Sequence, residues 1–152
     1  MKKSTTPTIK TLAMETTAHL NKTMARTTIN TFENFALLSA KAFIDSYEWL
    51  LYAVGKTYDV YTILEVQYDF EDALRCVRRI ITNVEMNNYN DTVRKAFSIG
   101  NIGSLLNTLK YLIGKTEKIN EEAKRQCEKA WHEYENVGYW LYFLKKKMHE
   151  TT

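Results

Sequence analysis

The sequence predicts an all-α protein, a helical bundle preceded by an extended, partly helical N-terminal arm. Only five glycines and one proline, Pro7, occur among the 152 residues, and a sandwich or barrel would need many more turn residues. Apolar residues instead recur at intervals of three and four over long stretches, as they do on one face of a helix. A chain of this length has room for one core.

The first 31 residues differ in composition from the rest of the chain. All 19 aromatic residues lie at or beyond Phe32, whereas residues 1–31 contain ten of the 18 threonines. Five basic residues against Glu15 give this segment a net charge of +4, and the remainder has 16 basic and 17 acidic side chains. We therefore predict a nucleic-acid-binding arm, residues 1–31, and a helical bundle and assembly domain, residues 32–152.

The arm is expected to be only partly helical. Residues 1–8 predict an extended segment, and a sparse apolar stripe with helical spacing begins at Ile9. Threonine is a mediocre helix former, because its branched side chain has few rotamers in a helix and its hydroxyl competes for backbone groups. This helix is expected to need a partner to be stable.

Two long helices follow. The first is predicted to start with Asn30 as its N-cap and Glu33 at the third helical position, a capping box, and to end at Gly55 in a left-handed conformation. The second, over about residues 58–86, has an unbroken three-four stripe that predicts long helix packing. That stripe consists of Val60, Ile63, Gln67, Phe70, Leu74, Val77, Ile81 and Val84.

The C-terminal half predicts a short helix to about Ser98, a compact apolar helix between Gly103 and Gly114, and a long helix over about residues 115–149. The stripe of this last helix is predicted to pack along the stripe of residues 58–86. Other faces of the last helix are apolar too, and one core cannot bury them all. We predict a subunit interface there, with ordinary half-exposed aromatics as the alternative: Trp131, Tyr139, Trp140, Tyr142 and Phe143.

No motif for catalysis accompanies these helices. A Glu and a His four residues apart, such as Glu15 and His19, indicate surface pairing, and no histidine has the spacing of a zinc or di-iron ligand set. Cys76 and Cys127 are isolated and are expected as buried thiols, with a disulfide possible if their helices pack together. We therefore predict no enzymatic activity, no metal, no cofactor and no small-molecule substrate.

The predicted nucleic-acid-binding residues are basic and lie in the arm and on the polar side of the third helix: Lys2, Lys3, Lys10, Lys22, Arg26, Arg75, Arg78 and Arg79. On helical spacing the three arginines converge on one patch, with Arg94 and Lys95 nearby in sequence. Such residues neutralise phosphates without reading bases. The alternative for the arginines is a salt-bridged surface with Glu71 and Asp72, and for the arm a soluble tail.

The C-terminal part of the sequence does not predict a transmembrane helix. The run of lysines 145–147 complements the dipole of the last helix, and with the preceding aromatics it is also compatible with a membrane surface. The longest uncharged apolar run there, Val137–Leu144, has eight residues, whereas a transmembrane helix needs about 20. The N-terminus lacks the apolar core of a signal peptide.

This layout, a helical arm with threonine and lysine followed by a neutral bundle with exposed aromatics, resembles the major coat proteins of filamentous and rod-shaped archaeal DNA viruses. The resemblance implies that paired subunits wrap double-stranded DNA with their N-terminal helices while the bundles form the wall of a helical particle. It implies that Lys2, Lys3, Lys10, Lys22 and Arg26 face the DNA. It also implies a virion location, with the host cytoplasm before assembly, and a partner subunit that is identical or paralogous, with or without a lipid envelope.

The physical requirements of a coat agree with these features. A coat binds every sequence of its genome, so it needs phosphate contacts, and it polymerises through open, repeated interfaces. Two alternatives remain open. One is a small helical adaptor or surface-coating protein that binds a protein or lipid partner through exposed aromatics, and the other is a chromatin-like architectural protein.

Overall fold

A computed structural model describes residues 8–57, 60–100 and 121–150 of the chain. Over these ranges it contains five helices and no strand, which confirms the all-α bundle. The helices are α1 (Ile9–Met24), α2 (Phe32–Thr57), α3 (Val60–Glu85), α4 (Tyr89–Gly100) and α6 (Glu121–Glu150). The helix predicted between Gly103 and Gly114 lies outside the described residues.

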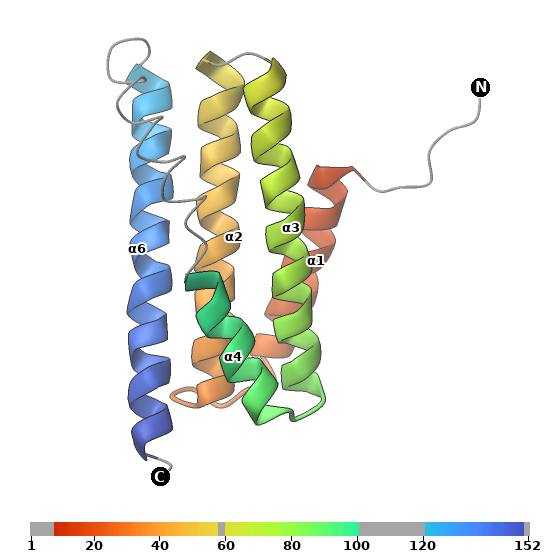
Figure 1. The fold of residues 1–152 in the computed structure, drawn as a ribbon, viewed down its shortest axis with the longest axis vertical. Coiled ribbons are helices and arrows are strands. Elements are labelled where there is room, and N and C mark those ends of the chain that lie inside the picture. Colours follow the sequence, from red (N-terminus) through yellow and green to blue (C-terminus); the bar gives the residue numbers. More distant parts are fainter. Residues whose placement is uncertain (1–7, 58–59, 101–120, 151–152) are drawn as a thin grey trace, which may run out of the picture.

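Helix α2 is the centre of the bundle. It packs against all four of the other described helices, and most extensively against α6. Helices α6 and α3 lie on opposite sides of α2 (Figure 1), and no Cα atoms of these two helices lie within 8 Å of one another. The prediction that the third and last helices pack along their stripes is therefore wrong, because α6 packs mainly against α2 and α3 packs against α2, α4 and α1. A three-four stripe fits any apolar neighbour and does not choose among them.

Three contacts fix the antiparallel alignment of α2 and α6. Near the start of α2, the ring of Phe35 stacks on Trp140 with centroids 6.1 Å apart. In the middle, the buried Ser46 hydroxyl donates a 2.8 Å hydrogen bond to the carbonyl oxygen of Ala130. Near the end, Lys56 pairs with Glu122 at 2.5 Å. The two helices also bury alanines completely, which allows close approach of their backbones: Ala36, Ala40, Ala53, Ala123 and Ala130.

Helix α3 is buried over its C-terminal two thirds. Phe70, Leu74, Val77 and Ile81 of the predicted stripe are at most 1% exposed, as expected. The first turn differs, because Val60 belongs to the same stripe but is 70% exposed. The N-terminal turns of α3 therefore have fewer neighbours than the regular spacing suggests.

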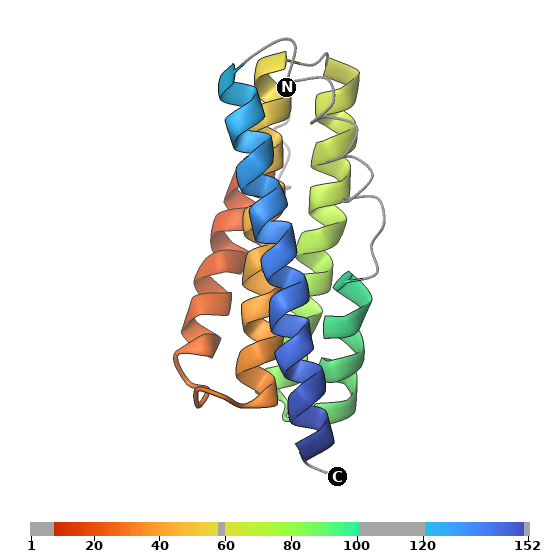
Figure 2. The same cartoon turned by 90° about the vertical axis from the view of Figure 1, so that its left-hand side faces the viewer.

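Helix α1 packs beside α3 and runs in the same direction (Figures 1 and 2). It buries Ala13, Thr16, Leu20 and Thr23, and Leu20 is fully inaccessible. Residues 9–24, which we assigned to the N-terminal arm, form a helix that packs on the bundle. The partner that this threonine-rich helix needs is α3, which accepts its small residues in the interface and supplies hydrogen-bonding groups to its hydroxyls.

The start of α2 lies one residue later than the predicted capping box. The Thr31 hydroxyl, not the side chain of Asn30, accepts a 3.3 Å hydrogen bond from the amide of Asn34. Asn30 instead has a left-handed backbone, with φ of 70°, a conformation that asparagine tolerates. Gly55 lies inside α2, and no glycine in the described ranges has a positive φ, so the predicted cap at Gly55 is wrong.

Leu74 provides a test of the core. It is 0% exposed, whereas Leu64 on the same helix is 57% exposed. We expect Leu74→Ala to lower the free energy of unfolding by about 2 to 5 kcal/mol, because it removes buried methyl groups and leaves a cavity. Leu64→Ala, the matched control, should change it by less than about 0.5 kcal/mol. Urea denaturation followed by circular dichroism measures both, and equal losses would contradict the described burial.

Asp45 provides a test by pH. Partial burial raises the pKa of this α2 carboxyl above its ordinary value of 3.8, and the nearby Glu133 carboxylate of α6 raises it further. Because the folded pKa exceeds the unfolded one, stability is lost as pH rises through this window. Asp45→Asn should therefore raise the thermal midpoint at pH 7 and leave it nearly unchanged at pH 3, where both side chains are neutral. An equal shift at both pH values would rule out the charge as its cause.

Candidate nucleic-acid interface

A basic groove of about 420 Å³ lies between the C-terminal half of α3 and the first turns of α4. The two helices form a hairpin whose turn contains Asn87 in a left-handed conformation, with φ of 56°. The turn brings together arginines and a lysine that are far apart on an extended chain. Four basic side chains and one carboxylate line this groove, together with two neutral polar residues: Arg78, Arg79, Arg94, Lys95, Asp91, Thr82 and Asn83.

Part of this positive charge is compensated within the protein. The Arg78 guanidinium donates a 3.0 Å hydrogen bond from Nε to the Thr16 hydroxyl and lies 3.6 Å from the Glu15 carboxylate. Arg94 pairs with Asp91, which it follows by one helical turn. Of the described carboxylates, none pairs with Arg79 or Lys95, the remaining two cations. The groove therefore retains uncompensated positive charge.

The groove has the chemistry of an anion site. The planar guanidinium of Arg79 offers several donors to phosphate oxygens, and the ammonium of Lys95 supplies a point charge. The Thr82 hydroxyl and the Asn83 amide are neutral donors beside them. These groups suit a phosphate of the nucleic-acid backbone. Arg94 and Lys95 were not among the predicted site residues, because only the α3–α4 turn places them opposite the arginines of α3.

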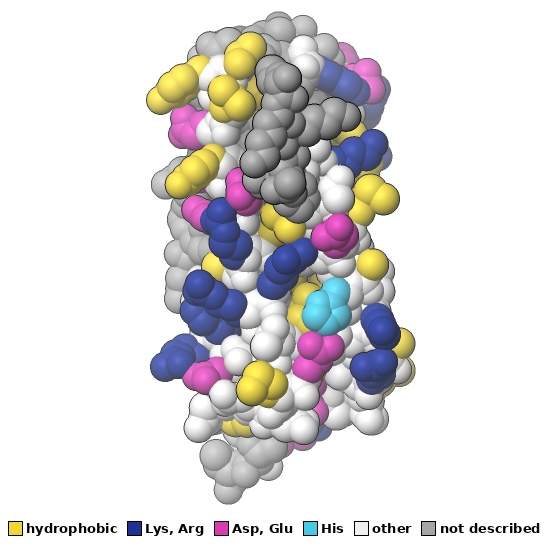
Figure 3. Space-filling model, turned by 90° about the vertical axis from the view of Figure 1, so that its right-hand side faces the viewer, with side chains coloured by type: hydrophobic (Ala, Val, Ile, Leu, Met, Phe, Trp, Pro, Cys, Tyr) yellow, Lys and Arg dark blue, Asp and Glu magenta, His cyan; other side chains and the backbone are white. Residues whose placement is uncertain are grey.

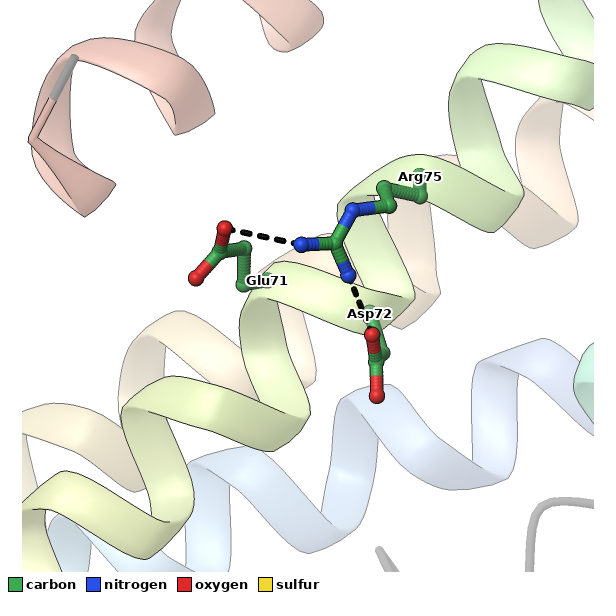
Figure 4. A network of polar contacts seen from close by, with 3 residues as sticks. All are labelled: Glu71, Asp72 and Arg75. Carbon is green, nitrogen blue, oxygen red and sulfur yellow. Dashed lines mark hydrogen bonds and ion pairs between the residues drawn. The ribbon is translucent and has the colours of Figure 1, made fainter. Parts of the chain in front are cut away.

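Arg75 does not line this groove, and its charge is compensated by acids of its own helix. Its guanidinium binds the carboxylates of Glu71, at 2.9 Å, and Asp72 (Figure 4). Both acids lie one turn before it on α3, so the pairing is local. Arg75 therefore belongs to a salt-bridged surface, which was the alternative to a binding role. Arg78 and Arg79 line the groove.

The basic residues of residues 1–31 occupy different places. Lys22 and Arg26 are exposed around the C-terminal end of α1, and the charge of Arg26 helps to lower the pKa of Glu85. Lys10 lies at the other end of α1, where it lines a groove of about 820 Å³ between α1, α2 and α3. Lys2 and Lys3 lie outside the described residues. Figure 3 shows basic side chains over the middle and lower part of the face formed by α1 and α3, interspersed with acids.

Glu85 ties α1 to α3. It accepts hydrogen bonds from His19, at 2.9 Å, and from the Thr23 hydroxyl, at 3.2 Å. The bond from His19 is the main cause that lowers the pKa of the Glu85 carboxyl. The sequence predicted that His19 pairs with Glu15 on its own helix, and this is wrong, since Glu15 instead lies beside Arg78. Both side chains of α1 reach across to α3.

The five aromatics predicted as a subunit interface fall into two groups. Trp131, Trp140 and Phe143 are half-buried and pack against the core of their own chain. Tyr139 and Tyr142 are 53% and 63% exposed, and their rings contact Phe143 edge-on. Of the five, these two tyrosines have the large exposed surfaces, because Trp140 and Phe143 stack on Phe35 and Trp131 packs against the core.

Other candidate chemistry is limited over the described ranges. Cys127 is buried and Cys76 half-buried, and no disulfide joins them. The described His, Cys, Asp and Glu side chains form no group of three that would hold a metal ion. None of the described helices is long and apolar enough to cross a membrane.

Comparison of the chain with protein-family models, curated proteins and solved structures gives no match.

The half-buried and the exposed aromatics of α6 should respond differently to substitution by alanine. Phe143→Ala is expected to lower the free energy of unfolding by about 1 to 3 kcal/mol, because it removes the ring stacked on Phe35 at 5.7 Å. Tyr142→Ala, its exposed neighbour, should change it by less than about 0.5 kcal/mol. Chemical denaturation of the two variants at low concentration measures the difference. Equal losses would place Tyr142 in the core.

Proposed function

We propose that this protein is a structural coat protein of a virion that binds double-stranded DNA through its backbone, without sequence preference, and polymerises into a helical filament. The observation that carries the proposal is the α3–α4 groove, where Arg79 and Lys95 lack a carboxylate partner among the described residues. Its location would be the virion, and the host cytoplasm before assembly. Its partners would be DNA and a second coat subunit, identical or paralogous, inside an envelope or without one.

The chemistry of the groove favours phosphate over bases. Its positive groups and neutral donors match phosphate oxygens, which are the same in every sequence. A particle that must cover its whole genome needs this kind of contact. Release of condensed counterions would supply much of the affinity, which would therefore fall steeply with salt.

Residues of α1 extend the proposed DNA surface beyond the groove. Arg78 joins the two, because it lines the groove and also contacts Thr16 and Glu15 of α1. Lys22 on α1 and Arg26, two residues beyond the end of that helix, are also exposed. Lys2, Lys3 and Lys10 belong to the proposal through the basic composition of residues 1–31. Deletion of residues 1–31 would not test this surface alone, since Leu20 is part of the core.

The second candidate is an adaptor or surface-coating protein that binds a protein or lipid partner. The exposed Tyr139 and Tyr142 favour it, because aromatic residues are enriched in interaction surfaces. Negative-stain microscopy with and without DNA separates the two candidates. Filaments support the coat, whereas small discrete oligomers that ignore DNA support the adaptor.

The groove is tested by removal of its two unpaired cations. We expect the Arg79→Ala/Lys95→Ala variant to bind duplex DNA more weakly on every sequence and to reduce the slope of log affinity against log salt by about 2, since each lost phosphate contact removes about 0.9. Fluorescence anisotropy over a salt series measures both quantities.

The matched control removes the same charge from paired cations. The control variant is Arg75→Ala/Lys56→Ala, because Arg75 pairs with Glu71 and Asp72 and Lys56 pairs with Glu122. In this variant the slope of log affinity against log salt should change little. A separate triple variant, Lys10→Ala/Lys22→Ala/Arg26→Ala, measures the contribution of α1. If both double variants lose affinity equally, only total charge matters and the groove is not the site.

A further inference from the structure

The N-terminal turns of α3 present an apolar surface that the stripe pattern did not predict. Val60, Tyr61, Leu64 and Tyr68 are between 57% and 76% exposed, and we call these four residues the α3 patch. Tyr61, Leu64 and Tyr68 follow one another at helical spacing on the side of α3 that faces away from the core. Hydrophobic side chains gather at the upper end of the face in Figure 3, above the basic region. Contiguous exposed apolar surface of this kind indicates an interaction site.

Negative charge without a counterion lies beside the α3 patch. Glu65 and Asp69 are on the same turns, and no described cation pairs with either. Partial burial raises the pKa of Asp69, and the neighbouring carboxylates of Glu65 and Asp72 raise it further. Asp72 differs from both, because it is paired with Arg75. The aromatic rings of the α3 patch are therefore flanked by two carboxylates that repel one another.

A second exposed patch on α6 has the opposite charge. It consists of Tyr139 and Tyr142 with Lys145 and Lys146 one turn later, and we call these four residues the α6 patch. Both lysines are exposed, and no described carboxylate pairs with them. The next lysine, Lys147, is held at 3.5 Å from Glu150. The α6 patch thus combines tyrosines with unpaired lysines, whereas the tyrosines of the α3 patch lie beside unpaired carboxylates.

The two patches lie at opposite ends of the bundle. Helix α3 begins at the upper end in Figures 1 and 2, whereas the C-terminal half of α6 lies at the lower end on the other side of α2. They are different surfaces, so a contact between them joins unlike parts of two copies. Such a contact leaves one patch free on each copy and propagates into an open chain if the rotation does not close a ring.

We propose that the α3 patch of one copy binds the α6 patch of the next, and that this head-to-tail contact polymerises the protein. The proposal rests on the self-association part of the proposed function and names the surfaces that carry it. Tyrosines would pack on apolar residues, and Lys145 and Lys146 would reach Glu65 and Asp69. Pairing of either patch with itself is disfavoured, since it would oppose like charges.

Helical spacing makes this contact geometrically consistent. Both patches contain two apolar residues three positions apart, Tyr61 with Leu64 in the α3 patch and Tyr139 with Tyr142 in the α6 patch. When the two helices lie side by side and parallel in this register, the lysines fall within about one turn of Asp69. A lysine side chain spans that separation. Aromatic contact and charge pairing are therefore compatible in one arrangement.

Charge reversal tests the contact. We expect Lys145→Glu/Lys146→Glu and Glu65→Lys/Asp69→Lys each to weaken self-association by about 100-fold or more, because like charges then meet. An equimolar mixture of the two variants should assemble again, since every contact in an alternating chain would join opposite charges. Sedimentation velocity and negative-stain microscopy, both without DNA, measure assembly. Circular dichroism shows whether each variant is folded, and Glu65→Lys alone replaces the double variant if Asp69→Lys unfolds.

Three outcomes would overturn the proposal. They are a wild-type chain that stays monomeric at its solubility limit, a charge-reversal variant that assembles by itself like the wild type, and an equimolar mixture of the two variants that does not assemble. Arg125→Glu/Lys129→Glu is the matched control, with the same change of charge at exposed positions of α6 outside the patch, and it should assemble normally. Because DNA is absent, failure of DNA binding leaves these results unaffected. Conversely, a normal assembly series with no DNA affinity would reject the coat function and keep the contact.

Discussion

The close packing of α2 on α6 is the constraint on which the rest of the structure depends. Alanines on both helices are fully buried, so the two backbones approach closely. The same close packing buries the Ser46 hydroxyl, which donates its hydrogen bond to the Ala130 carbonyl instead of to water. A larger residue at such positions would force the helices apart. With α6 fixed on one side, the other sides of α2 remain for α1, α3 and α4.

The position of α3 explains why its two ends differ chemically. Its C-terminal half is enclosed by α2, α1 and α4, so its outward arginines meet polar groups of two neighbouring helices. Its N-terminal turns have fewer neighbours, and Tyr61 and Tyr68 face outward there. One helix thus carries a basic surface at one end and an aromatic, acidic surface at the other. Separation of the two surfaces along α3 would allow nucleic acid and a neighbouring copy to bind at the same time.

Sequence patterns predicted the elements better than their partners. The stripe from Phe70 to Ile81 correctly identified a buried face, because helical spacing is a local property of the chain. The same spacing was uninformative about which helix covers that face, and the α3–α6 pairing was wrong. Likewise, the charges of Arg75 and Arg79 are equivalent in sequence. Only the structure distinguishes the arginine held by Glu71 and Asp72 from the arginine that lines the groove.

The way α1 is held has a consequence for the motions of the folded protein. Its contacts with α3 include two buried threonines and two surface pairs, His19 with Glu85 and Glu15 with Arg78, and Leu20 is its one fully buried large side chain. Separation of α1 from the bundle would expose little apolar surface, and would therefore need less free energy than global unfolding. Amide hydrogens of α1 should exchange with solvent through a local opening whose free energy depends weakly on denaturant. Those of α2 should exchange only when the whole bundle unfolds.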